Sequence, residues 1–164
     1  MIKLLKKTVT KVEAPPAKAY TLRAIILSSL ADGTSRIDNP LLGEDQLNLI
    51  ECLRGLGVDI KRNGSSLIVS GTNGHFNPII EEIYVGESGV SMNVLSSLAS
   101  LVKTPITITG AEGLLVRPID EVINGLRQLK CDIEYVDKEG FPPIKINSGT
   151  IFGGRTEISG KKTS

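Results

Sequence analysis

Two cations stand at the entrance of the first long apolar segment of this chain. Lys18 follows Pro15 and Pro16, and Arg23 comes five residues later, inside a run of apolar helix formers. The start of a helix offers unpaired backbone N–H groups and a partial positive charge, so it attracts anions. Lysine and arginine side chains add full charges. The stretch therefore predicts a site for a phosphate or a carboxylate.

Two further segments have the same character. The sequence "GESG" (86–89) precedes a second apolar run, and "SGKKTS" (159–164) stands at the end of the chain. Glycine allows the backbone to approach a ligand closely. If the three segments meet, they form one pocket for a polyanion. Plainer interpretations stay open, because Ser88 and Ser164 could be helix N-caps and the lysine pair at 161–162 could be solvated charge.

Composition excludes several classes of function. The 164 residues carry 19 Lys and Arg against 18 Asp and Glu, and only 4% are aromatic, with no Trp. A nucleic-acid surface would show a basic excess and stacking aromatics, so no such partner is expected. No apolar run is long enough to cross a bilayer and no signal peptide is evident, so we expect a cytoplasmic protein with no membrane partner. One His and two separate Cys make a metal site improbable, and Cys52 and Cys131 are predicted to be core residues.

Periodicity and turn residues predict an α/β chain made of alternating strands and helices. The expected helices cover residues 19–31, 44–56, 90–102 and 119–129. The expected strands cover residues 7–12, 35–37, 58–62, 66–71, 82–86 and 105–110, and a closing hairpin covers 131–147. Asn63-Gly64-Ser65 marks a hairpin between two of these strands.

The two halves repeat one another. The word "LSSLA" occurs at 27–31 and again at 95–99, and "LRGLGVDI" at 53–60 matches "LRQLKCDI" at 126–133 in five of eight places. Matches that coincide with predicted elements indicate a structural repeat. We expect βαβαββ units at about 7–71 and 81–149, with a third that opens on a strand at 155–160 and stops at 164. Residues 1–164 would then form a single, apparently truncated domain.

The first helix of each unit has apolar or small residues on nearly every face, as "AYTLRAIILSSLA" and "VSMNVLSSLASLV" show. Helices of this kind are buried all round. The strands alternate polar and apolar residues, which is typical of a sheet with one face in water. The sequence therefore predicts helices inside and sheets outside.

The ordered motifs resemble one known family. The segment "PPAKAYTLRAIILSSLADGTSRIDNPLLGEDQLNLIECLRGLGVDI" is similar to the N-terminal region of 5-enolpyruvylshikimate-3-phosphate synthases. Four later motifs fit in order, and the resemblance covers about residues 14–164: "GESGVSMN", "LLVRPIDEVINGLRQL", "GFPPIKI" and "ISGKKTS". It implies one domain of an inside-out α/β barrel and a second domain that closes over a cleft.

The resemblance also implies a reaction and a set of site residues. The family moves the enolpyruvyl group of phosphoenolpyruvate to the 5-hydroxyl of shikimate 3-phosphate in aromatic amino-acid biosynthesis, with no metal or organic cofactor. Lys18 would bridge both substrates as the catalytic lysine, and Arg23 would hold the shikimate carboxylate. Gly89 and Arg117 would contact the phosphate of phosphoenolpyruvate. Thr163 and Ser164 would bind the 3-phosphate.

Four positions depart from the family pattern and keep a second hypothesis open. Ala19 stands for a serine, Glu87 for an asparagine, Val90 for a threonine and Asn93 for an arginine. Ala19, Glu87 and Asn93 favour a degenerate, non-catalytic relative that serves as an anion-binding or regulatory module. Lys18, Arg23 and Arg117 favour the enzyme. A sibling enzyme that uses a UDP-sugar has a cysteine before its Arg-Pro, and "GAEGLLVRP" has none. We expect the chain alone to be inactive and to self-associate.

Overall fold

The computed structural model describes residues 11–148 and 151–160. This part of the chain contains five helices and seven strands. The helices are α1 (Lys18–Leu30), α2 (Glu44–Gly55), α3 (Gly89–Ala99), α4 (Glu112–Leu115) and α5 (Asp120–Gln128). The strands are β1 (Thr34–Asp38), β2 (Asp59–Asn63), β3 (Ser66–Ser70), β4 (Glu82–Tyr84), β5 (Ile106–Thr109), β6 (Asp132–Tyr135) and β7 (Ile144–Ser148). Within these residues, no helix is long and apolar enough to cross a membrane.

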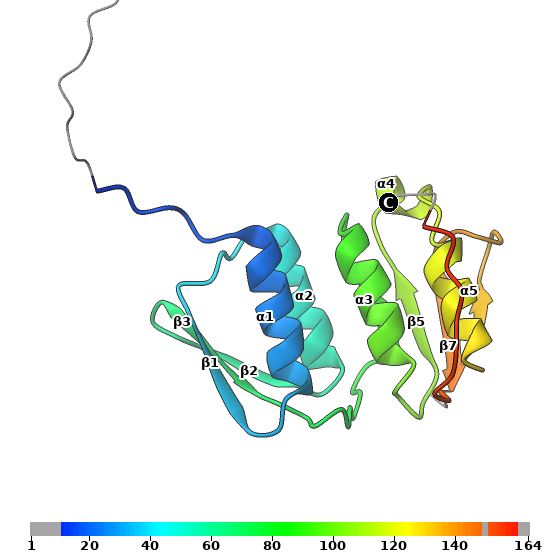
Figure 1. Ribbon diagram of the computed structural model, residues 1–164, viewed down its shortest axis with the longest axis horizontal. Coiled ribbons are helices and arrows are strands. Elements are labelled where there is room, and N and C mark those ends of the chain that lie inside the picture. The colour runs from blue at the N-terminus through cyan, green and yellow to red at the C-terminus, as the bar shows by residue number, and fades with distance from the viewer. Residues whose placement is uncertain (1–10, 149–150, 161–164) are drawn as a thin grey trace, which may run out of the picture.

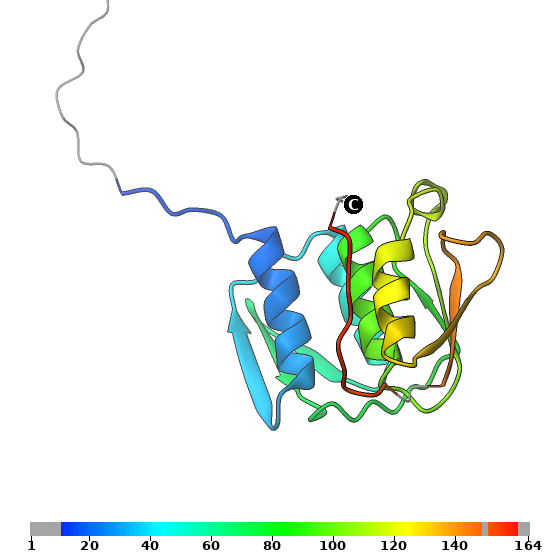
Figure 2. The ribbon, with the colours of Figure 1, turned by 45° about the vertical axis from the view of Figure 1, so that its right-hand side comes forward.

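The strands form two sheets. The first sheet has the order β1-β3-β2 and is antiparallel throughout, with Ile37 opposite Leu67 and Ile60 opposite Val69. The second has the order β4-β5-β7-β6, in which β4 and β5 are parallel and the other pairs are antiparallel. Figure 1 shows the first sheet on the left and the second on the right. Turning the molecule by 45° brings α5 and the second sheet forward (Figure 2).

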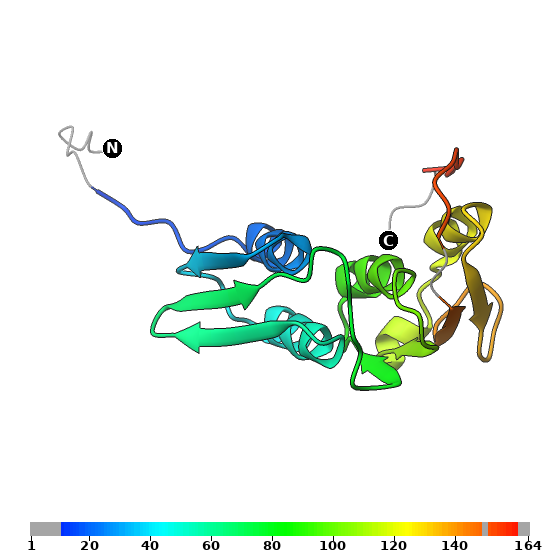
Figure 3. The same cartoon turned by 90° about the horizontal axis from the view of Figure 1, so that it is seen from below.

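The helices lie between the sheets, as the sequence predicts. Seen from below, α1 and α2 cover the first sheet and α3 and α5 cover the second, so that the strands are at the outside (Figure 3). The sheets present one polar face to solvent, since Asp59, Lys61 and Arg62 of β2 are exposed whereas Ile60 is buried. This is the α/β arrangement of helices inside and sheets outside.

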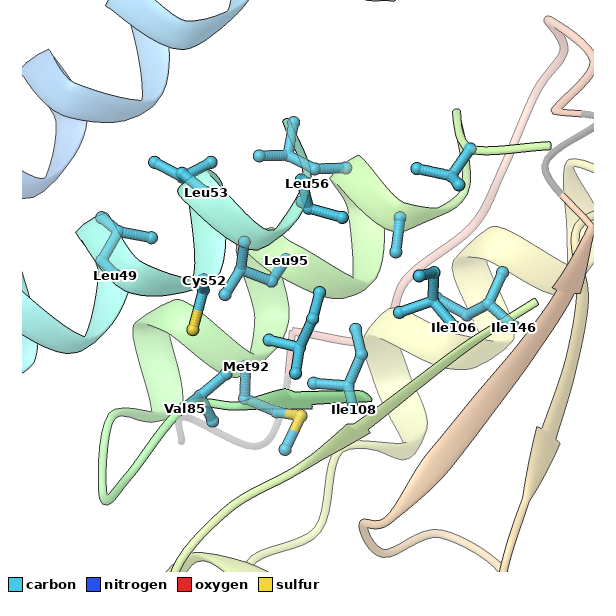
Figure 4. Close-up of a cluster of buried hydrophobic side chains, with 14 of the residues drawn as sticks. Leu49, Cys52, Leu53, Leu56, Val85, Met92, Leu95, Ile106, Ile108 and Ile146 are labelled. Carbon is cyan, nitrogen blue, oxygen red and sulfur yellow. The ribbon is translucent and has the colours of Figure 1, made fainter. Parts of the chain in front are cut away.

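Helix α2 forms the centre of the core. Leu49, Leu53 and Leu56 are fully buried, and the Cys52 thiol donates to the backbone oxygen of Tyr84 at 3.3 Å. Figure 4 shows these side chains beside Met92 and Leu95 of α3, with Ile106 and Ile108 of β5 beyond. Both cysteines are buried, as expected of core residues. One apolar core therefore joins the two halves of the described chain.

The same helix-to-strand connection occurs twice. Arg54 at the end of α2 donates to the carbonyl oxygen of Ile60 through Nε at 3.1 Å and Nη2 at 2.6 Å. Arg127 at the end of α5 donates through Nε to the carbonyl oxygen of Ile133 at 2.9 Å. Both helices also begin with acidic residues and end with an arginine, which complements the helix dipole. The sequence repeat is thus matched by a repeat of contacts.

Four expectations need correction or fall outside the described chain. Helix α1 is not buried all round, because Tyr20 is 79% and Leu27 is 67% exposed. Helix α3 also has an exposed face, since Val90 is 54% exposed. The residues 155–160 form no strand. Instead, the Gln128 amide bonds both backbone groups of Glu157, which holds the segment on α5. The opening strand at 7–12 lies mostly outside the described residues, and its last two residues form no strand. The short helix α4 was not predicted.

Candidate anion-binding site

Helix α1 begins at Lys18, and its start is fixed to the start of α2. The Lys18 ammonium forms an ion pair with the Asp45 carboxylate, and the two side chains are 60% and 22% exposed. The Gln46 amide donates to the backbone oxygen of Lys18 at 3.2 Å. Ala17, the residue before the helix, makes no side-chain cap. Lys18 is therefore held at a helix start, close to an acidic partner, with its charge still reachable from solvent.

Arg23 lies further along α1 and folds back along the helix. Its Nη1 donates to the backbone oxygen of Ala19 at 3.0 Å, and the residue is exposed. The neighbouring Thr21 accepts a hydrogen bond from the backbone N–H of Leu41 at 3.0 Å, which fixes the loop before α2 to the same turn. A single local hydrogen bond leaves the other guanidinium donors of Arg23 available for a carboxylate.

Helix α3 provides the second predicted helix start. Ser88 is its N-cap, and its hydroxyl accepts from the backbone N–H and the hydroxyl of Ser91 at 3.3 and 2.9 Å. The plainer interpretation of Ser88 as a cap is therefore correct. Gly89, the first helical residue, has empty space on its outer side, since a Cβ built there would meet no atom within 4 Å. That space is open to a ligand.

Arg117 follows α4 and faces the segment before α3. Its Nη2 lies 3.8 Å from Oε2 of Glu87, and the two side chains are 54% and 52% exposed. The structure thus brings together Arg117 and the loop that ends at Gly89. It also places a carboxylate on Arg117, at one of the positions that depart from the family pattern.

The two helix starts lie along one edge of the molecule. Asp45 and Asn48 are both in the first turns of α2, and Asp45 pairs with Lys18 on one side. On the other side, the Asn48 amide nitrogen is only 2.5 Å from where a Cβ of Gly86 would be. Figure 1 shows the start of α1 and the short helix α4 at the same upper edge. The remaining predicted site residues, Thr163 and Ser164, lie outside the described part of the chain.

Sequence reasoning missed Asp45 and Gly113 as neighbours of the site. Asp45 carries a recognisable signal, since acidic residues in the first turn of a helix point toward its N-terminal end. Gly113 carries none, because its contact with Glu87 depends on how α4 packs. Cys52 is not a candidate nucleophile, since burial raises the pKa of its thiol to about 11.

A known protein family matches nearly the whole chain. A family model described as EPSP synthase (3-phosphoshikimate 1-carboxyvinyltransferase) matches residues 2–164. The chain belongs to this family.

Curated relatives carry the same description. The chain is 35% identical over 153 residues to a 3-phosphoshikimate 1-carboxyvinyltransferase of Methanothermobacter thermautotrophicus, covering 93% of the chain and 36% of that relative. It is 37% identical over 164 residues to the one of Methanobrevibacter smithii, covering 99% of the chain and 37% of the relative. The chain therefore spans about a third of the length of these EPSP synthases.

A solved structure supports the fold. An EPSP synthase from Acinetobacter baumannii superimposes with a TM-score of 0.78 at 30% identity, over 85% of this chain and 32% of that one. The enolpyruvyl transferase NikO from Streptomyces tendae superimposes with a TM-score of 0.53 at 17% identity, which shows a shared fold alone.

Proposed function

We propose that this chain supplies one wall of the active site of a 3-phosphoshikimate 1-carboxyvinyltransferase of the shikimate pathway. The reaction transfers the enolpyruvyl group of phosphoenolpyruvate to the 5-hydroxyl of shikimate 3-phosphate and releases phosphate. The observation that carries the proposal is the line of cations and helix starts along one edge, with Lys18 at α1, open space at Gly89 and Arg117 after α4. Both substrates are phosphorylated carboxylates, which such an edge suits.

Lys18 is the residue proposed to act in catalysis. Its ammonium would lie between the two substrates and neutralise the carboxylate or phosphate of phosphoenolpyruvate as the hydroxyl attacks. The ion pair with Asp45 supports this role, because it holds a flexible side chain at the edge without burying its charge. Asp45 is thus a positioning residue in this proposal.

The other residues would bind and orient the substrates. Arg23 would take the shikimate carboxylate through guanidinium donors that its bond to Ala19 leaves available. Arg117 would take the phosphate of phosphoenolpyruvate, since its planar fork suits two oxygens, and Gly89 would let the α3 backbone approach the same phosphate. Thr163 and Ser164 would donate hydrogen bonds from their hydroxyl groups to the 3-phosphate of shikimate 3-phosphate.

The proposal includes a larger assembly. Residues 1–164 would form one enolpyruvyl-transferase-like domain, with units at about 7–71 and 81–149 and a third beginning at 155–164. Its partner would be the remaining two thirds that the longer relatives possess, which would close over the edge. The exposed face of α1 supports this arrangement, since it offers apolar surface to a further element.

One observation favours the second candidate, a non-catalytic anion-binding module. Glu87 lies where an anionic ligand would reach Arg117, and a carboxylate there weakens binding of a phosphate. An enzyme site and a simple anion site differ in selectivity. The enzyme site should bind shikimate 3-phosphate more tightly than another phosphorylated carboxylate of equal charge. A module whose binding depends only on charge should bind the two compounds equally.

Calorimetric titration tests the proposal. Shikimate 3-phosphate and 6-phosphogluconate, each of which carries one carboxylate and one phosphate, are titrated into the wild type and into Lys18→Ala, Arg23→Ala and Arg117→Ala. Loss of one charge-assisted hydrogen bond should weaken binding about ten- to a hundredfold, with the melting temperature nearly unchanged because exposed ion pairs stabilise little. Lys61→Ala is the matched control, since Lys61 is an exposed lysine paired with Asp59 on the outer sheet. Equal affinity of the wild type for both phosphorylated carboxylates would favour the module.

A further inference from the structure

Glu87 occupies a position that the proposed roles do not explain. Its carboxylate faces Arg117 across the gap between the start of α3 and the end of α4, and the closest oxygen and nitrogen are 3.8 Å apart. This separation is an ion pair without a short hydrogen bond, since charge-assisted N–H···O contacts measure about 2.7–2.9 Å. Arg117 is therefore attracted by Glu87 but keeps its donors available to a better acceptor.

Gly113 makes this contact possible. A Cβ built at Gly113 would lie 2.9 Å from both Oε1 and Oε2 of Glu87, closer than real side chains approach. The carboxylate thus rests directly on the bare backbone of α4. Any side chain at position 113 would displace the carboxylate from this place, and with it the contact to Arg117.

The backbone around Glu87 is fixed on both sides. The N–H of Ala111 donates to the carbonyl oxygen of Gly86 at 3.0 Å, which joins the loop before α3 to the loop before α4. Gly86 has a φ of +63°, in the left-handed region that favours glycine. Ser88 is buried as the cap of α3. The side chain of Glu87 is consequently directed from a rigid segment onto Gly113 and Arg117.

We propose that Glu87 is an internal carboxylate that competes with anionic ligands for Arg117, and that Gly113 is the residue that seats it there. This inference rests on the proposed anion site at Arg117. A small anion such as inorganic phosphate, which contacts little beyond Arg117, must displace Glu87 without compensation. A larger organophosphate offsets the loss through contacts elsewhere. Glu87 therefore sets selectivity against free phosphate, which the proposed reaction also releases.

Two substitutions distinguish the effect of the Glu87 charge from the effect of its position on Gly113. Glu87→Gln removes the charge and should tighten binding of inorganic phosphate about three- to tenfold, the range for an exposed ion pair and one nearby repulsion. Gly113→Ala keeps the net charge but displaces the carboxylate from its seat, and alanine favours the helical backbone. It should therefore change phosphate affinity in the same direction. Glu112→Gln is the matched control, because Glu112 is the exposed neighbour on α4.

Calorimetry with inorganic phosphate at low salt decides the matter, with circular dichroism to confirm folding. Tighter binding by Glu87→Gln and Gly113→Ala, lost when Arg117→Ala is added, supports the proposal. It is overturned if Glu112→Gln has the same effect as Glu87→Gln, if Gly113→Ala leaves affinity unchanged, or if no variant binds phosphate.

Titration of phosphoenolpyruvate distinguishes a failure of the Glu87 inference from a failure of the proposed function. If Arg117→Ala weakens the binding of phosphoenolpyruvate while Glu87→Gln leaves the affinity for phosphate unchanged, only the Glu87 inference fails. If Glu87→Gln tightens phosphate but phosphoenolpyruvate binds no better than phosphate, only the proposed function fails.

Discussion

Gly57 and Lys130 occupy the same place in the two repeats and share a left-handed backbone conformation, with φ of +91° and +69°. Each follows a helix, α2 or α5, and each precedes the strand to which the helix is joined. A residue in the left-handed conformation at this position ends the helix and turns the chain toward the next strand. Glycine adopts this conformation without steric cost. Lysine does not, so the second repeat keeps a strained residue at a position where the first has glycine.

The first prediction follows from this difference. Lys130→Gly should raise the free energy of unfolding by about 0.5–1 kcal/mol, because relief of the left-handed strain exceeds the extra entropy of glycine in the unfolded chain. Urea denaturation monitored by circular dichroism measures the change. Lys103→Gly is the control, since Lys103 has no positive φ and should lose stability slightly. Equal effects of the two substitutions would contradict the account.

Gly57 allows the converse prediction. A Cβ at this position would lie 2.4 Å from the carbonyl oxygen of Asn77, which is backbone and cannot move aside. Gly57→Ala should therefore destabilise the protein by about 1–3 kcal/mol, through both the clash and the positive φ. Gly64→Ala serves for comparison, because Gly64 also has a positive φ but no atom within 4 Å of the added Cβ. Its loss of stability should be smaller.

Much of the secondary structure was predictable because local signals define it. The predicted helices at 19–31 and 44–56 agree with α1 and α2 to within one residue at each end, where prolines, glycines and acidic first turns mark the limits. The helix at 90–102 is shorter in the structure and ends at Ala99, since apolar residues continue past the helix into the loop. The four-residue α4 is too short to show periodicity.

Burial and partners were less predictable because they depend on distant elements. The composition of α1 predicted burial on every face, yet what covers a helix is decided by its neighbours, and Tyr20 and Leu27 face outward. The family resemblance pointed to Lys18, Arg23 and Arg117 from the sequence alone. Their contacts with Asp45, Ala19 and Glu87 could not be read from it, because two of the three partners lie on other elements.

The stability of the protein should fall at alkaline pH through Cys52. Burial raises the pKa of this thiol from about 9 to about 11. The unfolded chain therefore loses its thiol proton first as the pH rises, so the contribution is fully present below pH 9 and is lost between about pH 9 and pH 11. At pH 10 the loss is about 1.4 kcal/mol.

Urea denaturation at pH 8 and pH 10 measures this effect. The difference in unfolding free energy between the two pH values should be smaller in Cys52→Ala than in the wild type by about 1 kcal/mol. Cys131→Ala should act in the same direction, since burial also raises the pKa of the Cys131 thiol. An unchanged pH dependence in Cys52→Ala would show that the thiol titrates alike in both states.

The open face of α1 should drive association of the isolated chain. Tyr20 and Leu27 are largely exposed on it, and apolar surface of this kind favours contact with other apolar surfaces. The double substitution Tyr20→Ser and Leu27→Gln should reduce binding of a hydrophobic dye and shift sedimentation toward the monomer. Ile79→Ser is the control, because Ile79 is equally exposed but lies in the segment between the two sheets. A wild-type chain that stays monomeric and binds no dye at high concentration would exclude this role for α1.

The chain alone should not catalyse the reaction, because its cations are open to solvent. The side chain of Lys18, the proposed catalytic residue, is 60% exposed, and that of Arg117 is 54% exposed. Water therefore screens the interaction of both charges with a substrate. In water two charges about 4 Å apart interact by only about 1 kcal/mol, whereas a closed, water-excluded site strengthens the same contacts several-fold. The described edge is open to solvent, and a reaction that needs charge stabilised as it develops gains little there. We expect phosphate release from phosphoenolpyruvate and shikimate 3-phosphate to stay at background with the purified chain.

Activity should appear when the chain is joined to the remaining two thirds of a relative such as the Methanobrevibacter smithii enzyme. In that joined protein, Lys18→Ala should abolish the activity. Turnover by the chain alone, sensitive to Lys18→Ala, would show that the open edge suffices for catalysis.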